Sequence, residues 1–463
     1  MNNPNPHHYL WRLSKKYGPL MTLHLGFKPT LVVSSAKMAK EVLKTHDLVF
    51  SSRPSLLGQQ KLSYNGLDIT FAPYSDHWRE MRKICVLHLF NLKRVQSFHS
   101  IREHEVSRMI EKIVASTSAS KESKLINLGE ITFSLTSAII CRIAFGRRYD
   151  DEGCERSRFH SLLDEAMVLL GSNFVSDHFP FMSWVNKFTG MSSRLEKVFK
   201  ELDLFYQEII DDHLDEKRDN SGQEDIIDVL LHLKKDNTLA IDIKFDHIKA
   251  VLMDIFIAGT DTSAATTVWA MTGLMKHPRA MKRAQEEVRN IIRDKSFVDE
   301  SDLQKLHYLK AVVKETLRLY NPVPLLAPHE STESCNINGY EIPPKTKVFV
   351  NAWAIGRDPE SWENSEEFSP ERFLGNSIDF YGKHFEFIPF GAGRRGCPGI
   401  HLGVVNVELA LANLVYSFDW ELPVGIKEED IDIDATPGII FHKKNPLCLI
   451  PKKYFGRMDV QAI

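Results

Sequence analysis

The distribution of apolar residues along the chain predicts mostly helices, with short strands at the margins. Residues 20–34 alternate between apolar and polar positions and then run apolar around a turn at residues 26–29, which predicts a β-hairpin. Beyond the hairpin, apolar residues recur mainly at the 3.6-residue period of a helix, and strands are indicated again only near residues 337–350 and at the C-terminus. Loops rich in Ser, Gly, Pro or charged residues are predicted at residues 115–123, 174–190 and 215–225.

One predicted helix, residues 248–276, is unusually long. Its ~29 residues would span ~43 Å, whereas a compact chain of this size has a radius of gyration near ~23 Å. The helix is apolar on nearly all sides, which is typical of a buried helix. We therefore expect it to cross the centre of the molecule. A second apolar helix is predicted from about residue 400 to residue 418.

The domain organisation follows from the same pattern. Average domain size alone would suggest about three domains. However, the chain contains no internal repeat, and none of the predicted loops is long enough to serve as a domain linker. We expect residues 1–463 to form a single domain that is mainly α with small β-sheets, an α+β fold.

Charge and cysteine content exclude several functional classes. The 58 Lys and Arg residues nearly balance 61 Asp and Glu residues, so no global charge favours nucleic acid as a partner. The six cysteines include no Cys-x-x-Cys pair, which argues against a disulfide scaffold or a zinc site. We expect no apolar run that approaches the ~18 residues of a membrane span, and the N-terminal residues show no signal-peptide h-region.

The most informative run is Phe390-Gly-Ala-Gly-Arg-Arg-Gly-Cys397-Pro-Gly399, directly before the second apolar helix. We expect Pro398 at the first helical position, which would place Cys397 at a helix N-terminus, where the dipole and the nearby Arg395 favour a thiolate. The glycines would let a flat group approach the sulfur. A buried thiolate in such a loop is an axial ligand for haem iron; the alternative is a buried cysteine beside an ordinary Gly-rich turn.

This run resembles the haem-binding signature of the cytochrome P450 superfamily, the haem-thiolate monooxygenases. The matching positions are Phe390, Gly393, Arg395, Cys397 and Gly399. The resemblance implies the cytochrome P450 fold, haem b (iron protoporphyrin IX) as cofactor, Cys397 as the iron ligand, and O2 as co-substrate. It also implies contacts of Phe390, Gly391, Arg395 and Gly399 with the haem.

Two further segments resemble the family. Glu315-Thr-Leu-Arg318 matches its Glu-x-x-Arg helix, and Pro370-Glu-Arg372-Phe matches the segment that completes its structural triad. By spacing alone, Glu315 and Arg318 would form a weak exposed ion pair. The resemblance implies instead that Glu315, Arg318 and Arg372 form a charged network that holds the loop leading to Cys397.

The long helix contains Ala258-Gly-Thr-Asp261-Thr262-Ser. A glycine inside a helix costs ~1 kcal/mol relative to alanine, and adjacent Thr and Ser residues tend to bend the helix. One interpretation is a kink with satisfied hydroxyl groups. The resemblance implies that this helix crosses the haem, that Ala258 lies beside it, and that Asp261 and Thr262 relay protons to O2.

Trp78 and Arg82 resemble the family residues that bind a haem propionate. They are four residues apart and therefore share one face of a helix, although such a pattern also fits a solvated basic face. His329 occupies a position where many family members have Arg, and its charge would depend on pH.

The resemblance implies an apolar substrate site. The candidate contacts, each of which also fits an ordinary core position, are Tyr64, Leu67, Phe71, Phe174, Phe179, Val323, Leu326, Ile439 and Ile440. Together they indicate a hydrophobic small molecule, with terpenoid, phenylpropanoid, alkaloid and oxime substrates all open.

The resemblance runs from Tyr17 to the C-terminal strands and is strongest to plant A-type enzymes of specialised metabolism. Those enzymes begin with a membrane helix, which these residues lack, so we expect a truncated form of a protein of the endoplasmic-reticulum membrane, facing the cytoplasm. Because the chain has no Gly-x-Gly-x-x-Gly nucleotide fingerprint, electrons would come from NADPH through a cytochrome P450 reductase. The basic residues that would face the reductase are Arg79, Lys83, Lys93 and Arg94.

Two other functions are compatible with a haem-thiolate site. An isomerase or dehydratase acting on peroxides or oximes would not need the Asp261–Thr262 pair. A non-catalytic haem-binding protein would need neither a reductase nor a substrate pocket.

Overall fold

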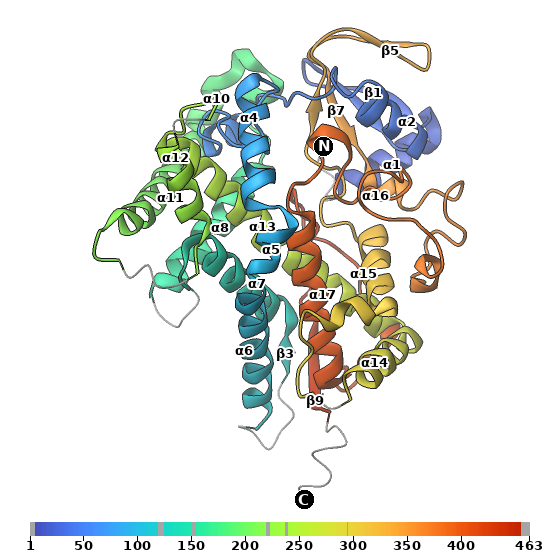
Figure 1. Cartoon of the computed structure of the whole chain (residues 1–463). Helices are drawn as coiled ribbons and strands as arrows, with labels where there is room; N and C mark the ends of the chain where they lie inside the picture. The colour runs from blue at the N-terminus through green and yellow to red at the C-terminus, as the bar shows by residue number, and fades with distance from the viewer. Residues whose placement is uncertain are drawn as a thin grey trace, which may run out of the picture.

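Helices account for most of the computed structural model, which describes residues 5–118, 125–149, 154–218, 223–236, 239–293 and 295–454 (Figure 1). The α-helices are α1 (Pro6–Tyr17), α2 (Ala36–Lys40), α3 (Leu57–Leu62), α4 (Asp76–Ile84), α5 (Leu92–Ser97), α6 (His99–Ser118), α7 (Leu128–Phe145), α8 (Cys154–Gly171), α9 (Val175–His178), α10 (Ser183–Phe188), α11 (Met191–Leu214), α12 (Ile226–Lys235), α13 (Phe245–Lys276), α14 (Pro278–Ile292), α15 (His307–Leu319), α16 (Ala352–Ile355) and α17 (Ile400–Ser417). Two π-helical turns, Glu41–Thr45 and Cys85–Leu89, extend α2 and α4.

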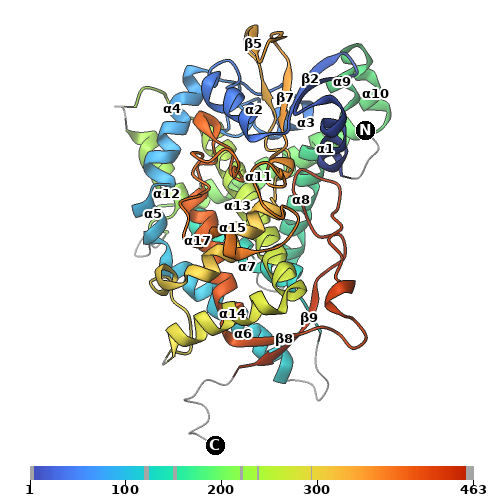
Figure 2. The same cartoon turned by 90° about the vertical axis from the view of Figure 1, so that its right-hand side faces the viewer.

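The strands form three small sheets. They are β1 (Leu20–Leu25), β2 (Lys28–Val33), β3 (Ile126–Asn127), β4 (His329–Glu330), β5 (Cys335–Ile337), β6 (Tyr340–Ile342), β7 (Lys347–Val350), β8 (Phe418–Glu421) and β9 (Cys448–Lys453). One sheet has the order β1-β2-β7-β4, a second β3-β9-β8, and β5 pairs with β6. The first two sheets lie at opposite ends of the molecule (Figure 2).

Both strand predictions are confirmed. The predicted hairpin is β1–β2, an antiparallel pair in which Leu20 faces Val33, and β7 then adds to β2 in parallel. The strands predicted near residues 337–350 and at the C-terminus are β5 to β7, β8 and β9. The fold is mainly helical with small sheets, as expected.

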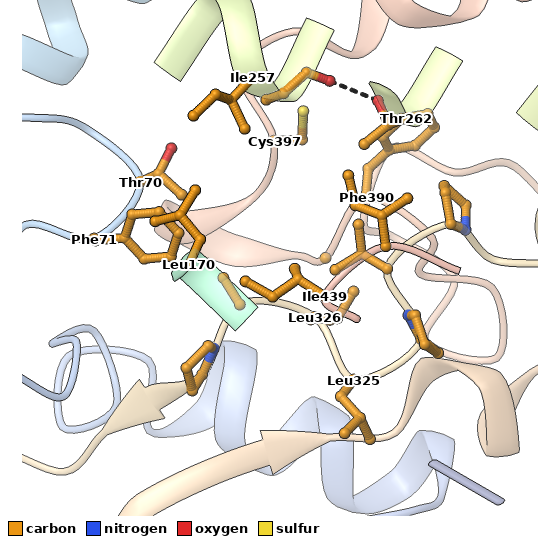
Figure 3. A pocket seen from close by; sticks show the side chains of 18 of the residues that line it. Thr70, Phe71, Leu170, Ile257, Thr262, Leu325, Leu326, Phe390, Cys397 and Ile439 are labelled. Atoms are coloured by element: carbon orange, nitrogen blue, oxygen red, sulfur yellow. Dashed lines mark hydrogen bonds between the residues drawn. The ribbon is translucent and has the colours of Figure 1, made fainter. Parts of the chain in front are cut away.

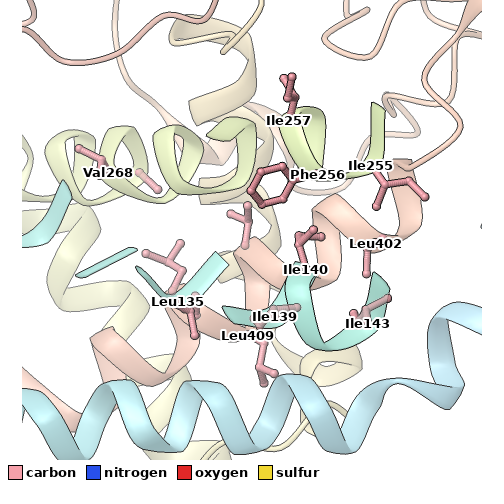
Figure 4. Close-up of a cluster of buried hydrophobic side chains, with 14 of the residues drawn as sticks. Leu135, Ile139, Ile140, Ile143, Ile255, Phe256, Ile257, Val268, Leu402 and Leu409 are labelled. Atoms are coloured by element: carbon pink, nitrogen blue, oxygen red, sulfur yellow. The ribbon is translucent and has the colours of Figure 1, made fainter. Parts of the chain in front are cut away.

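The predicted central helix is α13, which begins three residues earlier than expected, at Phe245. It is buried along most of its length and packs against α7, α15 and α17. Figure 4 shows part of this core, where side chains of α7 such as Ile139 and Ile140 lie near Phe256 of α13 and Leu409 of α17. Burial of each such side chain contributes about 1.5–3 kcal/mol, so packing dominates the stability of these helices.

Two predicted loops differ from the structure. Helix α6 continues to Ser118 through the first part of the loop predicted at 115–123, and residues 119–124 lie outside the described residues. The stretch 174–190 contains α9, a 3-10 turn at Pro180–Met182 and α10. In the loop predicted at 215–225, the described residues are irregular, as expected.

The expectation about apolar length was also wrong. Two helices, Leu128–Phe145 and Ile400–Ser417, are long and apolar enough to cross a membrane by length and composition, although the first contains Glu130 and Arg142 and the second contains Glu408. Each is 67% buried inside the protein. Their apolar composition is accounted for by packing against α13 in the core.

Candidate active site

A cavity of about 470 Å³ lies beside the middle of α13 (Figure 3). Asp254, Ala258 and Thr262 line it and follow one another at four-residue intervals, so they share one face of the helix. Ala258 is exposed although the helix around it is buried, because this face borders the cavity. The opposite walls come from the loop that carries Cys397, residues 322–329, residues 69–71, the end of α8 and residues 438–440.

The loop of Cys397 depends on glycine. Gly393 has φ 68° and a Cβ there would lie 2.3 Å from the Leu43 carbonyl oxygen, so no other residue fits without a shift. The backbone N–H of Cys397 donates to the Phe390 carbonyl at 2.9 Å. Helix α17 begins at Ile400, which places Pro398 in the turn before it rather than at the first helical position. The expected position of Pro398 was therefore wrong, but the Cys397 side chain is exposed to the cavity.

The electrostatics at Cys397 differ from the expectation that every contribution favours a thiolate. Burial raises the pKa of the Cys397 thiol, and the Gly399 N–H and the charge of Arg82 act against this rise. Arg395, the expected source of charge, instead donates to the carbonyls of Ser51 and Ala72 at 2.6 and 2.7 Å. A cation bound at the sulfur would reverse the balance, because a coordinating thiol is deprotonated outright.

The cavity has a cationic wall that sequence reasoning identified only in part. Arg53, Arg82 and Arg395 all line it. Burial, together with the neighbouring arginines, lowers the pKa of Arg53 to about 10 and that of Arg395 to about 8. Clustered buried cations of this kind fit anionic groups such as the carboxylates of iron protoporphyrin. With Cys397 as a sulfur ligand, the residues present fit a haem.

Arg53 was missed because nothing in its local sequence marks it. Its guanidinium donates to the carbonyls of Thr70 at 2.9 Å, Ala327 at 2.7 Å and Pro328 at 2.9 Å. These contacts bring three distant segments of the chain together. Only the tertiary structure places Arg53 beside Arg395.

Of the two predicted propionate ligands, only Arg82 lines the cavity. Arg82 lines the cavity and lies 5.6 Å from the centre of the Trp78 ring, so the two do share a face. The Trp78 indole N–H, however, donates to the Ile69 carbonyl at 3.0 Å, and Trp78 does not line the cavity. Its predicted bond to a propionate is therefore not supported by this geometry.

His329 lines the cavity, but its expected pH dependence is wrong. Its Nδ1 donates to the Phe50 carbonyl at 2.7 Å. Burial and the adjacent Arg53 lower the pKa of His329 well below its ordinary value. The ring is therefore neutral at physiological pH, with Nε2 as its unprotonated nitrogen.

Asp261 and Thr262 face in different directions, because successive helical residues are about 100° apart. Thr262 lines the cavity and its hydroxyl donates to the Ala258 carbonyl at 2.7 Å. Asp261 is buried away from the cavity and accepts from His442 Nε2 at 2.9 Å. Burial would lower the pKa of His442, but the hydrogen bond and charge of Asp261 raise it.

Gly259 has a packing role in α13, which is continuous through this motif. A Cβ at Gly259 would lie 2.7 Å from Ile140 Cδ1, so glycine lets α7 and α13 approach closely. The hydroxyl groups of Thr266 and Thr267, like that of Thr262, donate to the carbonyls four residues before them. Within the motif the Thr262 hydroxyl is thus satisfied without a break in the helix, whereas the buried Thr260 hydroxyl has no hydrogen-bond partner among the described residues.

The predicted triad is assembled. Arg318 donates to both carboxylate oxygens of Glu315 at 2.7 Å, and Arg372 Nε donates to Glu315 at 3.0 Å. The side chains of Glu315 and Arg318 are fully buried. Arg318 also donates to the carbonyls of Gly356 and Ser365 at 2.6 Å, so the network ties α15 to the segment that precedes the Cys397 loop.

Comparison with known proteins settles the family. The family model described as "Cytochrome P450" matches residues 2–450. The chain is a cytochrome P450. It is 50% identical to "Cytochrome P450 71A1" of Persea americana over 455 residues, which cover 97% of this chain and 90% of that protein. It is 53% identical to "5-OH-xanthotoxin synthase" of Pastinaca sativa over 458 residues, covering 97% of this chain and 89% of that protein.

A solved structure supports the same assignment. A zebra fish cytochrome P450 with abiraterone has a TM-score of 0.82 and 26% sequence identity to this chain, covering 98% of this chain and 100% of the other. The predicted P450 fold is therefore confirmed, and the named relatives are plant enzymes, as the resemblance indicated. This P450 belongs to a family of haem-dependent monooxygenases.

Five of the nine predicted substrate contacts line the cavity of this P450. They are Phe71, Val323, Leu326, Ile439 and Ile440. The other four, Tyr64, Leu67, Phe174 and Phe179, do not line it. Several lining residues were missed, including Thr70, Leu170, Ile257 and Leu325 (Figure 3).

The four exceptions have other contacts or positions. The Tyr64 hydroxyl donates to Asp203 at 3.0 Å, and Phe174 is buried in the main hydrophobic core. Phe179 is 37% exposed and contacts the ring of Phe27. Leu67 is partly buried outside the cavity.

The basic cluster predicted to face a reductase is largely neutralised by the P450's own acids. Arg79 pairs with Asp76, Lys83 with Glu80 at 3.3 Å and Arg94 with Glu224 at 2.9 Å. Lys93 is exposed. The cluster therefore presents less positive charge than its sequence indicated.

Proposed function

We propose that this P450 inserts one oxygen atom from O2 into a hydrophobic plant secondary metabolite, with electrons from NADPH delivered by a cytochrome P450 reductase. In the balanced reaction, R–H, O2, NADPH and H⁺ give R–OH, H2O and NADP⁺. The observation that carries this proposal is a largely apolar cavity that reaches both the Cys397 side chain and Thr262 on α13. Relatives of this P450 named "6,7,8-trihydroxycoumarin synthase" and "Strychnine-11-hydroxylase" support hydroxylation of small molecules.

The haem would be held by residues of two kinds. Cys397 would ligate the iron, and Arg53, Arg82 and Arg395 would hold the anionic carboxylates on the cationic wall. The bound haem supplies the activation of O2 that protein side chains do not provide. The neutral His329, whose Nδ1–H is donated to the Phe50 carbonyl, would accept a hydrogen bond through Nε2 at this wall without adding charge. The part of the cavity beside Cys397 and α13 is also lined by Phe390, Gly391, Gly399 and Ala258.

Thr262 and Asp261 would take part in proton transfer to the cavity. The Thr262 hydroxyl faces the cavity and donates its hydrogen to the Ala258 carbonyl, so its oxygen can accept a hydrogen bond from a group in the cavity. Donation of this hydrogen into the cavity requires the bond to the Ala258 carbonyl to break. Asp261 is paired with His442, and proton delivery from Asp261 requires this pair to exchange partners. Phe71, Val323, Leu326, Ile439 and Ile440 would orient the apolar substrate and exclude water.

We further propose that this P450 acts at a membrane surface on the cytoplasmic face of the endoplasmic reticulum. Five exposed aromatic residues lie on the β1–β2 turn and on the segment from α9 to α10: Phe27, Phe179, Phe181, Trp184 and Phe188. The rings of Phe27 and Phe181 are 5.3 Å apart, which joins the two segments. Phe188 is 84% exposed. Exposed apolar groups of this kind are characteristic of membrane or protein contacts.

Reconstitution with a plant reductase, NADPH and ¹⁸O2 tests the proposed reaction. A panel of coumarins, terpenoids, alkaloids and oximes is screened by the spectral shift of the haem and by product mass. Incorporation of one ¹⁸O atom into product is expected. A product of unchanged oxygen content, formed without O2, would instead indicate an isomerase or dehydratase.

Thr262→Ala tests the proton role in the same system. We expect NADPH consumption to continue while product formation falls, because the hydroxyl group of residue 262 is lost from the cavity wall. Thr267→Ala is the matched control, since the Thr267 hydroxyl makes the same bond to the carbonyl four residues before it but does not line the cavity. Tightly coupled turnover by the Thr262 variant would refute the proposed role.

A further inference from the structure

Two aspartates, Asp68 and Asp254, contact one another in the wall of the cavity. Asp254 lies on the cavity face of α13, in an otherwise apolar stretch. Asp68 is only 2% exposed and lies in the segment that joins α3 to α4. The two side chains are within hydrogen-bond contact. Carboxylates are almost never buried together unless a cation or a proton compensates their charge.

The two acids hold the backbone of residues 68–72, which we call the strap. The Ile69 N–H donates to Asp254 Oδ2 at 2.8 Å, and the Phe71 N–H donates to Asp68 Oδ2 at 2.9 Å. Thr70 donates to Asp254 with both its backbone N–H and its hydroxyl, and the Ala72 N–H donates to Asp68. Both carboxyl groups are therefore committed to the strap.

The carbonyl groups of the strap are bound from the other side. The Ile69 carbonyl accepts from Trp78 at 3.0 Å, the Thr70 carbonyl from Arg53 at 2.9 Å and the Ala72 carbonyl from Arg395 at 2.7 Å. The N–H groups of the strap thus bind the two aspartates, and its carbonyl groups bind Trp78 and two arginines of the cationic wall. Its residues Ile69, Thr70 and Phe71 line the cavity.

One atom in this network has no donor. Asp68 Oδ1 is buried and accepts no hydrogen bond from any group in the described part of the chain. If both acids were ionised, this oxygen would be left unpaired, and two negative charges would be in contact. A proton on Asp68 converts its carboxyl group into a donor to the Asp254 carboxylate and removes both costs.

We propose that Asp68 and Asp254 share one proton, and that this carboxyl–carboxylate hydrogen bond positions the strap and so sets the cavity wall at Thr70 and Phe71. The proton resides mainly on Asp68, because the ionised form of Asp254 is stabilised by three N–H and O–H donors, whereas Asp68 accepts from two and its Oδ1 accepts from none among the described residues. The two acids are positioning residues, since they act on the substrate through the strap.

The surrounding charges agree with this assignment. Burial and the charge of Asp254 raise the pKa of Asp68 well above its ordinary value. Arg53 and Arg395 face Asp68, and their positive charges favour its ionised form, but burial and the charge of Asp254 outweigh them. Cys85 and Tyr206 face Asp254, and burial raises the pKa of both, so both are neutral.

If the proton lies on Asp68, replacement of each acid by asparagine should affect the strap differently. Asp68→Asn replaces a neutral donor by an amide that still donates to Asp254, so the strap remains in place. Asp254→Asn removes the charged acceptor on which three donors converge. Glu408→Gln is the control, because Glu408 is another buried acid, on α17, whose pKa is raised to about 7 by burial.

Hydrogen–deuterium exchange of the ferric, substrate-free holoenzyme measures how strongly the backbone amides of the strap are protected. We expect the amides of residues 69–72 to exchange roughly tenfold or more faster in Asp254→Asn, as loss of hydrogen bonds to a buried charge predicts. Asp68→Asn and Glu408→Gln should match the wild type. Equal loosening in both aspartate variants would overturn the assignment of the proton to Asp68.

Infrared spectroscopy of the same holoenzyme detects the proton directly. The wild type should show a C=O band of a protonated, buried carboxyl group that Asp68→Asn lacks and Glu408→Gln retains. An unchanged band in Asp68→Asn would refute the shared proton even if Asp254→Asn fails to fold. Neither measurement uses turnover, so failure here would leave the proposed monooxygenase function untouched.

Discussion

Gly393→Ala tests whether the close approach of two backbone segments fixes the Cys397 loop. Gly393 has φ 68°, and its added Cβ would lie 2.3 Å from the Leu43 carbonyl oxygen. Gly375 has nearly the same conformation, φ 74°, but no atom of the described residues lies within 4 Å of its added Cβ. The two alanine variants therefore share the backbone strain and differ in the clash.

The magnitude follows from these two contributions. An alanine at positive φ costs about 1–2 kcal/mol, which is the whole expected cost of Gly375→Ala. The clash at Gly393 must be relieved by a backbone shift, because 3.4 Å is the shortest ordinary contact, and forced overpacking adds about 1–3 kcal/mol. With an unfolding entropy of about 1 kcal/mol/K for a chain of 463 residues, the expected fall in Tm is roughly 1–2 °C for Gly375→Ala and roughly 2–5 °C for Gly393→Ala.

Calorimetry of the holoenzyme and the spectrum of its reduced, CO-bound form are the assays. Gly393 lies four residues before Cys397, and its carbonyl accepts from the Gly396 N–H at 3.1 Å. A shift at Gly393 should therefore reduce the fraction of protein with thiolate ligation, whereas Gly375→Ala should retain it. Equal effects of the two substitutions on both readouts would refute the argument that contact with Leu43 fixes the loop.

Three other substitutions test the buried triad, the Asp261 pair and the cavity wall. Glu315→Gln breaks a fully buried ion-pair network and should cost about 3–5 kcal/mol, seen as a Tm lower by roughly 3–5 °C in calorimetry; a change below about 1 °C would contradict the role of the network. His442→Gln should lower Tm most below the ordinary histidine pKa of 6.5, where the bond to Asp261 holds a protonated ring. This difference in Tm should shrink as the pH rises through the raised pKa of His442. A difference that grows with pH would refute the pairing. Leu170→Phe should weaken binding of the best compound from the substrate screen severalfold in a spectral titration, because the larger side chain narrows the cavity. Phe179→Ala, outside the cavity, should leave the affinity unchanged. A larger loss of affinity in Phe179→Ala than in Leu170→Phe would refute the assignment of the wall.

The parts predicted well from the sequence are those encoded in short-range patterns. The β1–β2 hairpin follows from local alternation and a turn, and α13 follows from an apolar stretch long enough to cross the molecule. The Glu315–Arg318 pair is set by helical spacing, and only its burial needed the resemblance to the family. Local periodicity is a direct consequence of backbone geometry, which explains this success.

The parts that failed depend on contacts between distant segments. Arg53 reaches Ala327, 274 residues away, and His442 reaches Asp261, 181 residues away. No local pattern encodes either contact. Apolar residues that line a cavity also have the same sequence pattern as apolar residues that fill a core, which is why Phe174 was misassigned and Leu170 was missed.

The spectrum of the reduced, CO-bound protein tests the central claim most directly, namely that Cys397 is the sulfur ligand of a haem in this cavity. The wild type should show the red-shifted Soret band of thiolate ligation, and Cys397→Ala should lose it. Cys335→Ala, which changes a cysteine outside the cavity, should retain the band. An unchanged spectrum in Cys397→Ala would contradict the account.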